Sequence, residues 1–187
     1  STFDVISDTE TAEGGQLNYQ RGSTFTFQNL TIKAGEGAFD GIVCDELTYY
    51  NCTITGKLTL YGKATFINCT FENDMADQYS IWTWGGTEVK FEGCTFNTNG
   101  KAILLYGKGP TDLIVSNCTF NDRNNGSAGK AAIEIGNDYN ATYSLTTTNC
   151  TVNGFADGKN TGSKLWANKN SMNAEHLSVT IDGEKVL

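Results

Sequence analysis

Apolar residues recur along the chain in one short pattern. Each copy has two apolar residues spaced by two, then asparagine or glycine, then two more apolar residues spaced by two. The copies are FTFQNLTI (25–32), LTYYNCTI (47–54), ATFINCTF (64–71), VKFEGCTF (89–96), LIVSNCTF (113–120) and LTTTNCTV (145–152). Alternation with a period of two is typical of β-strands whose apolar side chains face inward. Each copy therefore predicts two short strands separated by an interruption.

The interruption falls at the same place in every copy. It is occupied by Asn29, Asn51, Asn68, Gly93, Asn117 and Asn149. Asparagine and glycine are the residues that most readily adopt the left-handed backbone conformation. We therefore expect a tight corner between the two strands, with the asparagines stacked from one repeat to the next.

A second short strand recurs between the copies. Its segments are GIVCDEL (41–47), KLTLYGK (57–63), SIWTWGG (80–86), AILLYGK (102–108), AIEIGND (132–138) and KLWANKN (164–170). Three strands in so short a repeat leave no room for a helical crossover, and such units bury their apolar sides only by stacking. The pattern predicts an all-β chain with a single domain, a right-handed parallel β-helix of about six coils over 23–187. Residues 1–22 would form an N-terminal cap or linker, and 177–187 a last strand with an Asp-Gly turn.

The repeat resembles a known group of proteins. Its corner asparagines and inward columns are similar to those of the pectin-lyase-like parallel β-helix superfamily. Segments such as LYGKATFINCTF (60–71), GKAILLYGKG (100–109) and GSKLWANKNSM (162–172) resemble repeats in surface proteins of gut-dwelling bacteria and their phages. The resemblance covers about 25–187. It implies an extracellular location, on a cell or virion surface, and brings no defined catalytic motif with it.

The asparagine–cysteine–threonine triplet can be a glycosylation signal, a cysteine site or the corner itself. The asparagines that precede x-Ser/Thr are Asn29, Asn51, Asn68, Asn117, Asn125, Asn140 and Asn149. We favour the corner for the five that lie in the repeat, because Gly93 fits a corner and cannot carry a glycan. Asn125 and Asn140 lie in predicted loops and are the expected acceptors.

Five of the six cysteines share one inward position: Cys52, Cys69, Cys94, Cys118 and Cys150. Cys44 belongs to the second strand. Stacked neighbours lie within disulfide range, but their Cβ vectors run parallel, so the sulfur atoms do not turn toward each other. The repeat lacks Cys-x-x-Cys and the single histidine, His176, lies outside it, which argues against zinc. We expect reduced, buried thiols, a low-oxygen habitat such as that of an anaerobic gut bacterium, and no metal or other cofactor.

The charge balance excludes several classes of partner. Lys and Arg total 13 against 21 Asp and Glu, for a formal net charge of −8. No basic stripe follows a phosphate backbone, so we expect no nucleic acid. No apolar run is long enough to cross a bilayer, so we expect no membrane insertion. The chain begins at Ser1 without Met, and we expect a processed protein or an excised domain.

The second strand predicts an aromatic surface. If Ile81/Thr83, Leu165/Ala167 and their counterparts point inward, the alternate residues point outward. That outward set is Val43, Thr59, Tyr61, Trp82, Trp84, Leu104, Tyr106, Glu134 and Trp166. The expected binding residues among them are Tyr61, Trp82, Trp84, Leu104, Tyr106 and Trp166. Loops at 72–79, 121–130 and 153–163, or residues 1–22, could cover this surface. If it is open, it would bind a protein, another copy of the chain in a homo-oligomer or larger assembly, or a glycan.

Catalysis is the competing hypothesis. A polysaccharide lyase or hydrolase needs carboxylates and a base that converge in one cleft. Asp45 and Glu134 are several repeats apart, and the two arginines, Arg21 and Arg123, lie in the N-terminal segment and in a loop. We therefore predict no catalytic residues and a non-enzymatic adhesion or display module. The alternatives are a small polysaccharide-degrading lyase or hydrolase, and a structural phage virion or spacer module.

Overall fold

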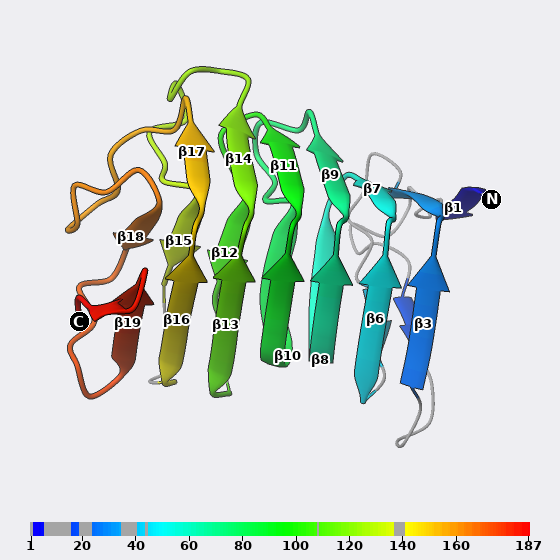
Figure 1. Ribbon diagram of the computed structural model, residues 1–187, viewed down its shortest axis with the longest axis horizontal. Helices are drawn as coiled ribbons and strands as arrows, with labels where there is room; N and C mark the ends of the chain where they lie inside the picture. Colours follow the sequence, from blue (N-terminus) through cyan, green and yellow to red (C-terminus); the bar gives the residue numbers. More distant parts are fainter. Residues whose placement is uncertain are drawn as a thin grey trace.

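The chain forms three parallel faces that wind around one core (Figure 1). The computed structural model describes residues 2–5, 16–18, 24–34, 41–43, 45–107, 109–136 and 141–187. These residues form strands and turns but no helix, and therefore no helix that could cross a membrane. The predicted parallel β-helix is confirmed.

The first face, called here the long face, carries the strand that precedes each corner. Its strands are β3 (Thr24–Gln28), β6 (Glu46–Tyr50), the second halves of β8 (Leu58–Ile67) and β10 (Ile81–Glu92), β13 (Thr111–Ser116), β16 (Tyr143–Thr148) and β19 (Leu177–Ile181). The threonine face follows the corner. It contains β1 (Thr2–Val5), β4 (Thr31–Ala34), β7 (Thr53–Thr55), β9 (Thr70–Asn73), β11 (Thr95–Thr98), β14 (Thr119–Asp122) and β17 (Thr151–Asn153).

The third face, called the short face, lies between the loop after the threonine face and the bend into the long face. It is made of the first halves of β8 and β10 with β12 (Ile103–Leu105), β15 (Ile133–Ile135) and β18 (Trp166–Asn168). Two further strands, β2 (Gln16–Asn18) and β5 (Gly41–Val43), pair with each other. In Figure 1 the short face lies behind the long face.

The corner between the long and threonine faces has the predicted left-handed backbone in all six copies. The φ angles are 56° at Asn29, 50° at Asn51, 53° at Asn68, 62° at Gly93, 53° at Asn117 and 51° at Asn149. Side chains stack along part of this corner: Asn149 Nδ2 donates to Asn117 Oδ1 at 2.8 Å, and Asn51 Nδ2 to Asn29 Oδ1 at 3.4 Å. The corner therefore requires a residue that adopts the left-handed backbone conformation, and each coil has asparagine or glycine there.

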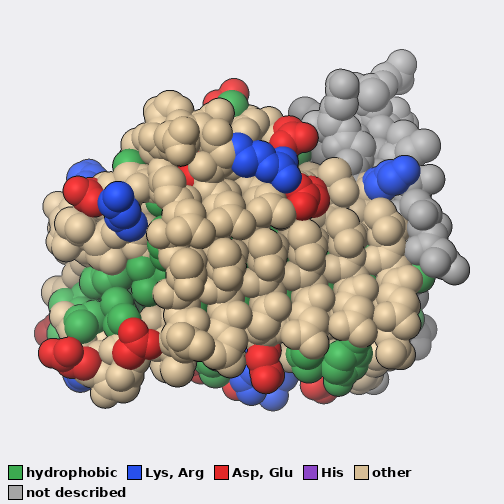
Figure 2. Space-filling model, turned by 45° about the horizontal axis from the view of Figure 1, so that its top comes forward, with side chains coloured by type: hydrophobic (Ala, Val, Ile, Leu, Met, Phe, Trp, Pro, Cys, Tyr) green, Lys and Arg blue, Asp and Glu red, His purple; other side chains and the backbone are tan. Residues whose placement is uncertain are grey.

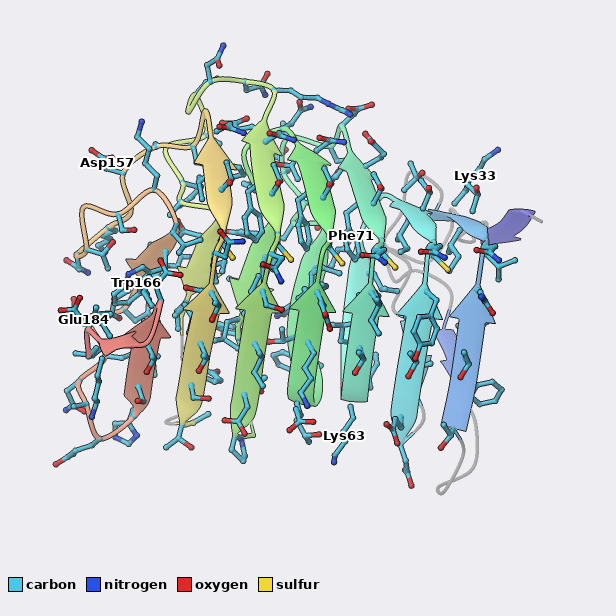
Figure 3. The ribbon with its side chains drawn as sticks, viewed as in Figure 1. Lys33, Lys63, Phe71, Asp157, Trp166 and Glu184 are labelled. Carbon is cyan, nitrogen blue, oxygen red and sulfur yellow. The ribbon has the colours of Figure 1, made fainter. Side chains whose placement is uncertain are left out.

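Aromatic rings stack from coil to coil in the core. Phe27, Tyr49, Phe66 and Phe91 form a column on the long face with centroid distances of 5.1, 4.7 and 4.9 Å. Phe71, Phe96 and Phe120 form a second column on the threonine face, at 4.4 and 4.8 Å. The two columns meet edge to face, and Figure 3 shows Phe71 between the faces. Parallel in-register pairing produces these columns, because it places the same repeat position directly above itself.

The cysteine column lies just inside the corner, and its thiols are reduced. Cys52, Cys69, Cys94, Cys118 and Cys150 are free, and the first four are buried. Each thiol donates to a backbone carbonyl near the corner; Cys94 Sγ, for example, lies 3.5 Å from the oxygens of Phe66 and Glu92. Burial raises the pKa of the Cys52 and Cys150 thiols, and contact with the neighbouring Cys118 thiol raises that of Cys94. The Cys52, Cys94 and Cys150 thiols therefore stay protonated, whereas contact with the Cys94 thiol lowers the pKa of Cys69 and of Cys118. Cys44 lies outside the described residues.

The two ends of the stack add strands beyond the six repeats. At the N-terminal end β1 pairs with β4, with Thr2 beside Thr31. At the C-terminal end β19 pairs with β16 and turns through Asp182 and Gly183 into β20 (Glu184–Lys185), which confirms the Asp-Gly hairpin. Among the described residues, each of the two larger faces consequently has seven parallel strands.

The threonine face is flat and carries few charges along its middle. Its strands align threonines in one outward column from Thr31 to Thr151. A neighbouring column is joined by amide hydrogen bonds from Asn97 to Glu72, from Asn121 to Asn97 and from Asn153 to Asn121. Figure 2 shows this broad surface with hydrophobic and charged side chains mainly at its margins. The two cavities described below are lined instead by residues of the loops and of the short face, so the candidate site lies elsewhere.

Candidate functional site

The outer side of the short face is where the sequence predicts a binding surface. The register aligns one residue of each coil in one outward column: Thr59, Trp82, Leu104, Glu134 and Ala167. Thr59 and Glu134 are each 2% exposed and Ala167 is fully buried, whereas Trp82 and Leu104 between them are half-buried. The accessible part of this column is therefore its middle.

The loop 153–163 covers the C-terminal part of the column. A Cβ added to Gly158 would lie 2.9 Å from the Cβ of Ala167 and 2.3 Å from the carbonyl oxygen of Trp166. This loop backbone therefore lies directly against β18, and only glycine fits at the contact. Ala167 is therefore not accessible to a ligand.

Trp166 does not belong to the outward surface, and that prediction is wrong. It pairs with Ile133 and through it with Ile103, so it occupies the inward column, and it is 8% exposed. Leu165 and Ala167 are accordingly not the inward pair. Within the described chain no coil of the short face follows β18, so a large ring at the last inward position closes the core. Figure 3 shows Trp166 at this C-terminal end of the stack.

Trp82, Trp84 and Tyr106 come together as predicted, and we call them the aromatic cluster. Trp82 and Trp84 pack edge to face with centroids 5.2 Å apart, and Trp84 stacks on Tyr106 at 6.0 Å. Trp82 and Tyr106 lie 6.1 Å apart. All three rings are half-buried, so each is packed on one side and leaves surface for contact on another. Such an arrangement presents rigid aromatic rings to a ligand.

The bend between the short and long faces positions this cluster. The register of β8 and β10 shifts between Trp82 and Gly85, so Tyr61 pairs with Gly85 and its ring lies 2.7 Å from the position of a Cβ there. Tyr61 therefore lies beside the cluster, against the glycine of the bend. A Cβ on Gly107 would likewise come within 2.3 Å of the carbonyl oxygen of Trp84. The two glycines let neighbouring coils approach closely enough to bring the rings together.

Backbone hydrogen bonds hold Tyr106 in place. Its N–H donates to Thr83 Oγ1 at 3.1 Å. The next residue, Gly107, donates its N–H to the hydroxyl oxygen of Tyr143 at 2.8 Å, and the Tyr143 hydroxyl donates to the Gly107 carbonyl at 2.7 Å. The polypeptide under the exposed ring is therefore fixed before any ligand arrives.

A small cavity adjoins the cluster. It has a volume of about 210 Å³ and is lined by Lys57, Asp77, Gln78, Tyr79, Trp82 and Leu104. The ammonium group of Lys57 lies 4.6 Å from the centroid of the Trp82 ring, in cation–π contact. An aromatic wall beside amide, carboxylate and ammonium groups can hold a ligand with both apolar and hydroxylated surfaces.

The loop 74–79 forms one wall of this cavity, and hydrogen bonds hold it. Asn73 is 1% exposed; its Nδ2 donates to the carbonyl of Gln78 at 2.8 Å, and its Oδ1 accepts from the N–H of Met75 at 2.9 Å. Burial, and then the charge of Glu134, raise the pKa of Tyr79. The Tyr79 hydroxyl thus stays protonated and can act as a hydrogen-bond donor.

Asp45 and Glu134, the two strand carboxylates considered for catalysis, do not come together. Glu134 Oε1 accepts from the N–H of Ala131 at 3.0 Å, while Asp45 is exposed beside β6, several coils away. Over the described ranges no three His, Cys, Asp or Glu side chains group closely enough to hold a metal ion. Asn125 is exposed in its loop with φ of 48°, and Asn140 lies outside the described residues.

Sequence reasoning missed the polar half of the site. Lys57 precedes the second strand and was included in no column, and Asp77, Gln78 and Tyr79 lie in a loop without periodicity. Tyr79 lies immediately before the predicted segment 80–86, where the loop returns to the stack. That position could have indicated that Tyr79 lies close to the short face. The fold of the loop brings Asp77 and Gln78 to Trp82, and the pairing of β8 with β10 brings Lys57 there.

Comparison with known proteins identifies the family but no close relative. The family described as "Right handed beta helix region" matches residues 14–179, and the chain belongs to it. A search of curated proteins and a search of solved structures each found no significant match. The resemblance in the repeats is thereby confirmed at the level of a right-handed β-helix.

Proposed function

We propose that this member of the right-handed β-helix family is a non-enzymatic module that binds a glycan through its aromatic cluster. The observation that carries the proposal is the half-buried group of Trp82, Trp84 and Tyr106 beside a cavity with ammonium, amide and carboxylate groups. Sugars have an apolar ring face and a polar edge. An aromatic ring next to hydrogen-bonding groups matches both surfaces.

The size and rigidity of the cluster support a binding role. Three large side chains lie on a bend held by Gly85 and Gly107 and by the hydrogen bonds of Tyr143. A ligand therefore meets rings that need little ordering, which lowers the entropic cost of binding. We place the module on the surface of a bacterial cell or virion, where it would mediate adhesion or display.

The test is a glycan-array screen of wild type beside the double variant Trp82→Ala/Trp84→Ala. Wild type should bind a subset of the glycans, and the double variant should lose affinity on the order of 100-fold, since anchor residues of this kind each contribute roughly a factor of ten or more. The matched control is Tyr50→Ala, which removes an aromatic ring that is 37% exposed on the long face. It should leave binding unchanged.

Circular dichroism and thermal melting would establish that the variants stay folded. Retained glycan binding by a folded double variant would contradict the site. A wild type that binds no glycan would contradict the function and favour a protein interface, to be pursued by measuring the oligomeric state. Release of unsaturated or reducing sugar ends from a bound polysaccharide would instead establish a lyase or hydrolase.

A further inference from the structure

A second and larger cavity lies on the other side of the loop 74–79 from the aromatic cluster. Its volume is about 380 Å³, and it is lined by Ala76, Asp77, Asn99, Lys101, Asn124, Ser127, Ala128 and Lys130. Asp77 also lines the smaller cavity beside Trp82, so the two cavities are neighbours. We call the larger one the lysine pocket.

The walls of the lysine pocket are held by contacts between two loops. The guanidinium of Arg123 donates to Asp74 Oδ1 at 2.5 Å and also to Glu72, which ties the loop 121–130 to the loop that follows β9. The carboxylate of Asp122 accepts from the N–H groups of Asn124 at 2.8 Å and Gly126 at 2.6 Å. Asn99 donates to the carbonyl of Asp74. The pocket is therefore formed in the absence of a ligand.

Two lysines, Lys101 and Lys130, line this pocket. The Lys101 side chain is 19% exposed, and its closest carboxylate, that of Asp77, lies at 3.9 Å, which is longer than a hydrogen bond. Its other neighbour is the Tyr79 ring, at 5.8 Å. Lys130 is half-buried and forms no ion pair with the residues that the structure describes. Both lysines thus keep hydrogen-bonding capacity for another anion.

The pocket stands out against the charge of the whole chain. The formal net charge is −8, yet this cavity has two cations and a single carboxylate. That carboxylate, on Asp77, is 98% exposed, so water screens it, whereas Lys101 is largely shielded. A partly desolvated cation attracts an anion more strongly than an exposed one does. The amides of Asn99 and Asn124 and the hydroxyl of Ser127 add groups that suit sugar hydroxyls.

We propose that the lysine pocket binds the anionic group, a carboxylate or sulfate, of an acidic glycan whose adjoining sugars lie on the aromatic cluster. This inference rests on the proposed glycan binding and adds the chemical class of the ligand. The span from Lys101 to Tyr106 along the chain is at most about 17 Å. A short oligosaccharide is therefore long enough to reach both sites.

The experiment is isothermal titration with fragments of polygalacturonate, hyaluronan and chondroitin sulfate, each beside its carboxyl-reduced or desulfated form. Wild type should bind at least one acidic form on the order of tenfold or more tightly than its neutral counterpart, with affinity that falls as salt is added. Lys101→Gln/Lys130→Gln should abolish that preference and leave binding of the neutral form unchanged. Lys101→Arg/Lys130→Arg should retain most of it. The matched control is Lys159→Gln/Lys164→Gln, two exposed lysines on another loop.

The outcomes separate the two proposals. If wild type binds neutral and acidic forms equally, or the Lys101→Gln/Lys130→Gln variant keeps the preference, the anion site is wrong while glycan binding stands. If Trp82→Ala/Trp84→Ala also removes binding of the neutral forms, the aromatic cluster is the shared anchor. Failure of wild type to bind any probe, acidic or neutral, here and on the array would overturn both.

Discussion

The corner and the short face of this β-helix follow different rules. At the corner every coil has the same backbone conformation and nearly the same residues, asparagine or glycine and then a small inward side chain such as that of Cys94. On the short face the outward column changes from Thr59 to Trp82, Leu104 and Glu134 within four coils. The corner repeats one residue type from coil to coil, and the outer side of the short face does not.

This difference indicates where stability and where binding reside. A coil that lost its corner or its inward ring would disturb the coils on both sides, because each repeat packs only on its neighbours. Outward residues on the short face contact the next coil through individual pairs, such as Trp84 with Tyr106, and not through a column of identical residues. Large rings and lysines could therefore accumulate there at little cost to the fold. The comparison predicts large stability effects at the corner and core, and small ones at the aromatic cluster.

The largest expected effect is that of Cys94→Asp. The side chain is 1% exposed and lies between the Cys69 and Cys118 positions, so a carboxylate there would be buried without a cation. We expect a loss of at least about 3 kcal/mol in the free energy of unfolding, or failure to fold. Urea denaturation measures it, with Cys150→Asp at the half-buried end of the column as the milder comparison. Equal stability of Cys94→Asp and wild type would contradict the inward column.

The next effect compares a core ring with a surface ring. Phe96 is fully buried and stacks on Phe71 at 4.4 Å and on Phe120 at 4.8 Å, so Phe96→Ala should cost about 3–5 kcal/mol. Trp82→Ala removes a half-buried ring and should cost roughly 1–2 kcal/mol. Parallel denaturation curves check both values. If Trp82→Ala proved as damaging as Phe96→Ala, the cluster would be part of the core and the binding proposal would lose its basis.

The smallest effect tests the corner with two substitutions at one position. Gly93 has φ of +62°, and a Cβ there would lie 2.5 Å from Asn68 Oδ1, the end of a side chain that can rotate away. Gly93→Asn matches the other corners and should cost under about 1 kcal/mol, whereas β-branched Gly93→Val should cost about 2 kcal/mol. Thermal melting distinguishes them. Identical melting temperatures would show that the left-handed corner is not what selects asparagine or glycine.

Local rules explain why so much of the fold could be read from the residues. Period-two alternation identified the inward columns, and the interruption at Asn51 or Gly93 identified the corner, because strand pleat and left-handed conformation act within a few residues. The same alternation placed Trp82, Trp84 and Tyr106 on one side. It failed at Trp166, where Leu165 and Ala167 offered an equally apolar alternative. The side chain of β18 that faces inward was decided by the closing of the end of the stack, which no local pattern records.

The amino-acid sequence by itself determined the repeated coil, its corner, its reduced thiols and the outward position of the aromatic rings. The tertiary structure alone decided which part of the short face is covered, how Lys57 meets Trp82, and how Lys101 and Lys130 reach one cavity. The physical reason is the range of the interactions. Strand and corner preferences are set by neighbouring residues and repeat in every coil. The loops 74–79 and 121–130 are placed relative to each other by contacts between residues far apart in the chain, such as that of Arg123 with Asp74, and these contacts do not repeat from coil to coil.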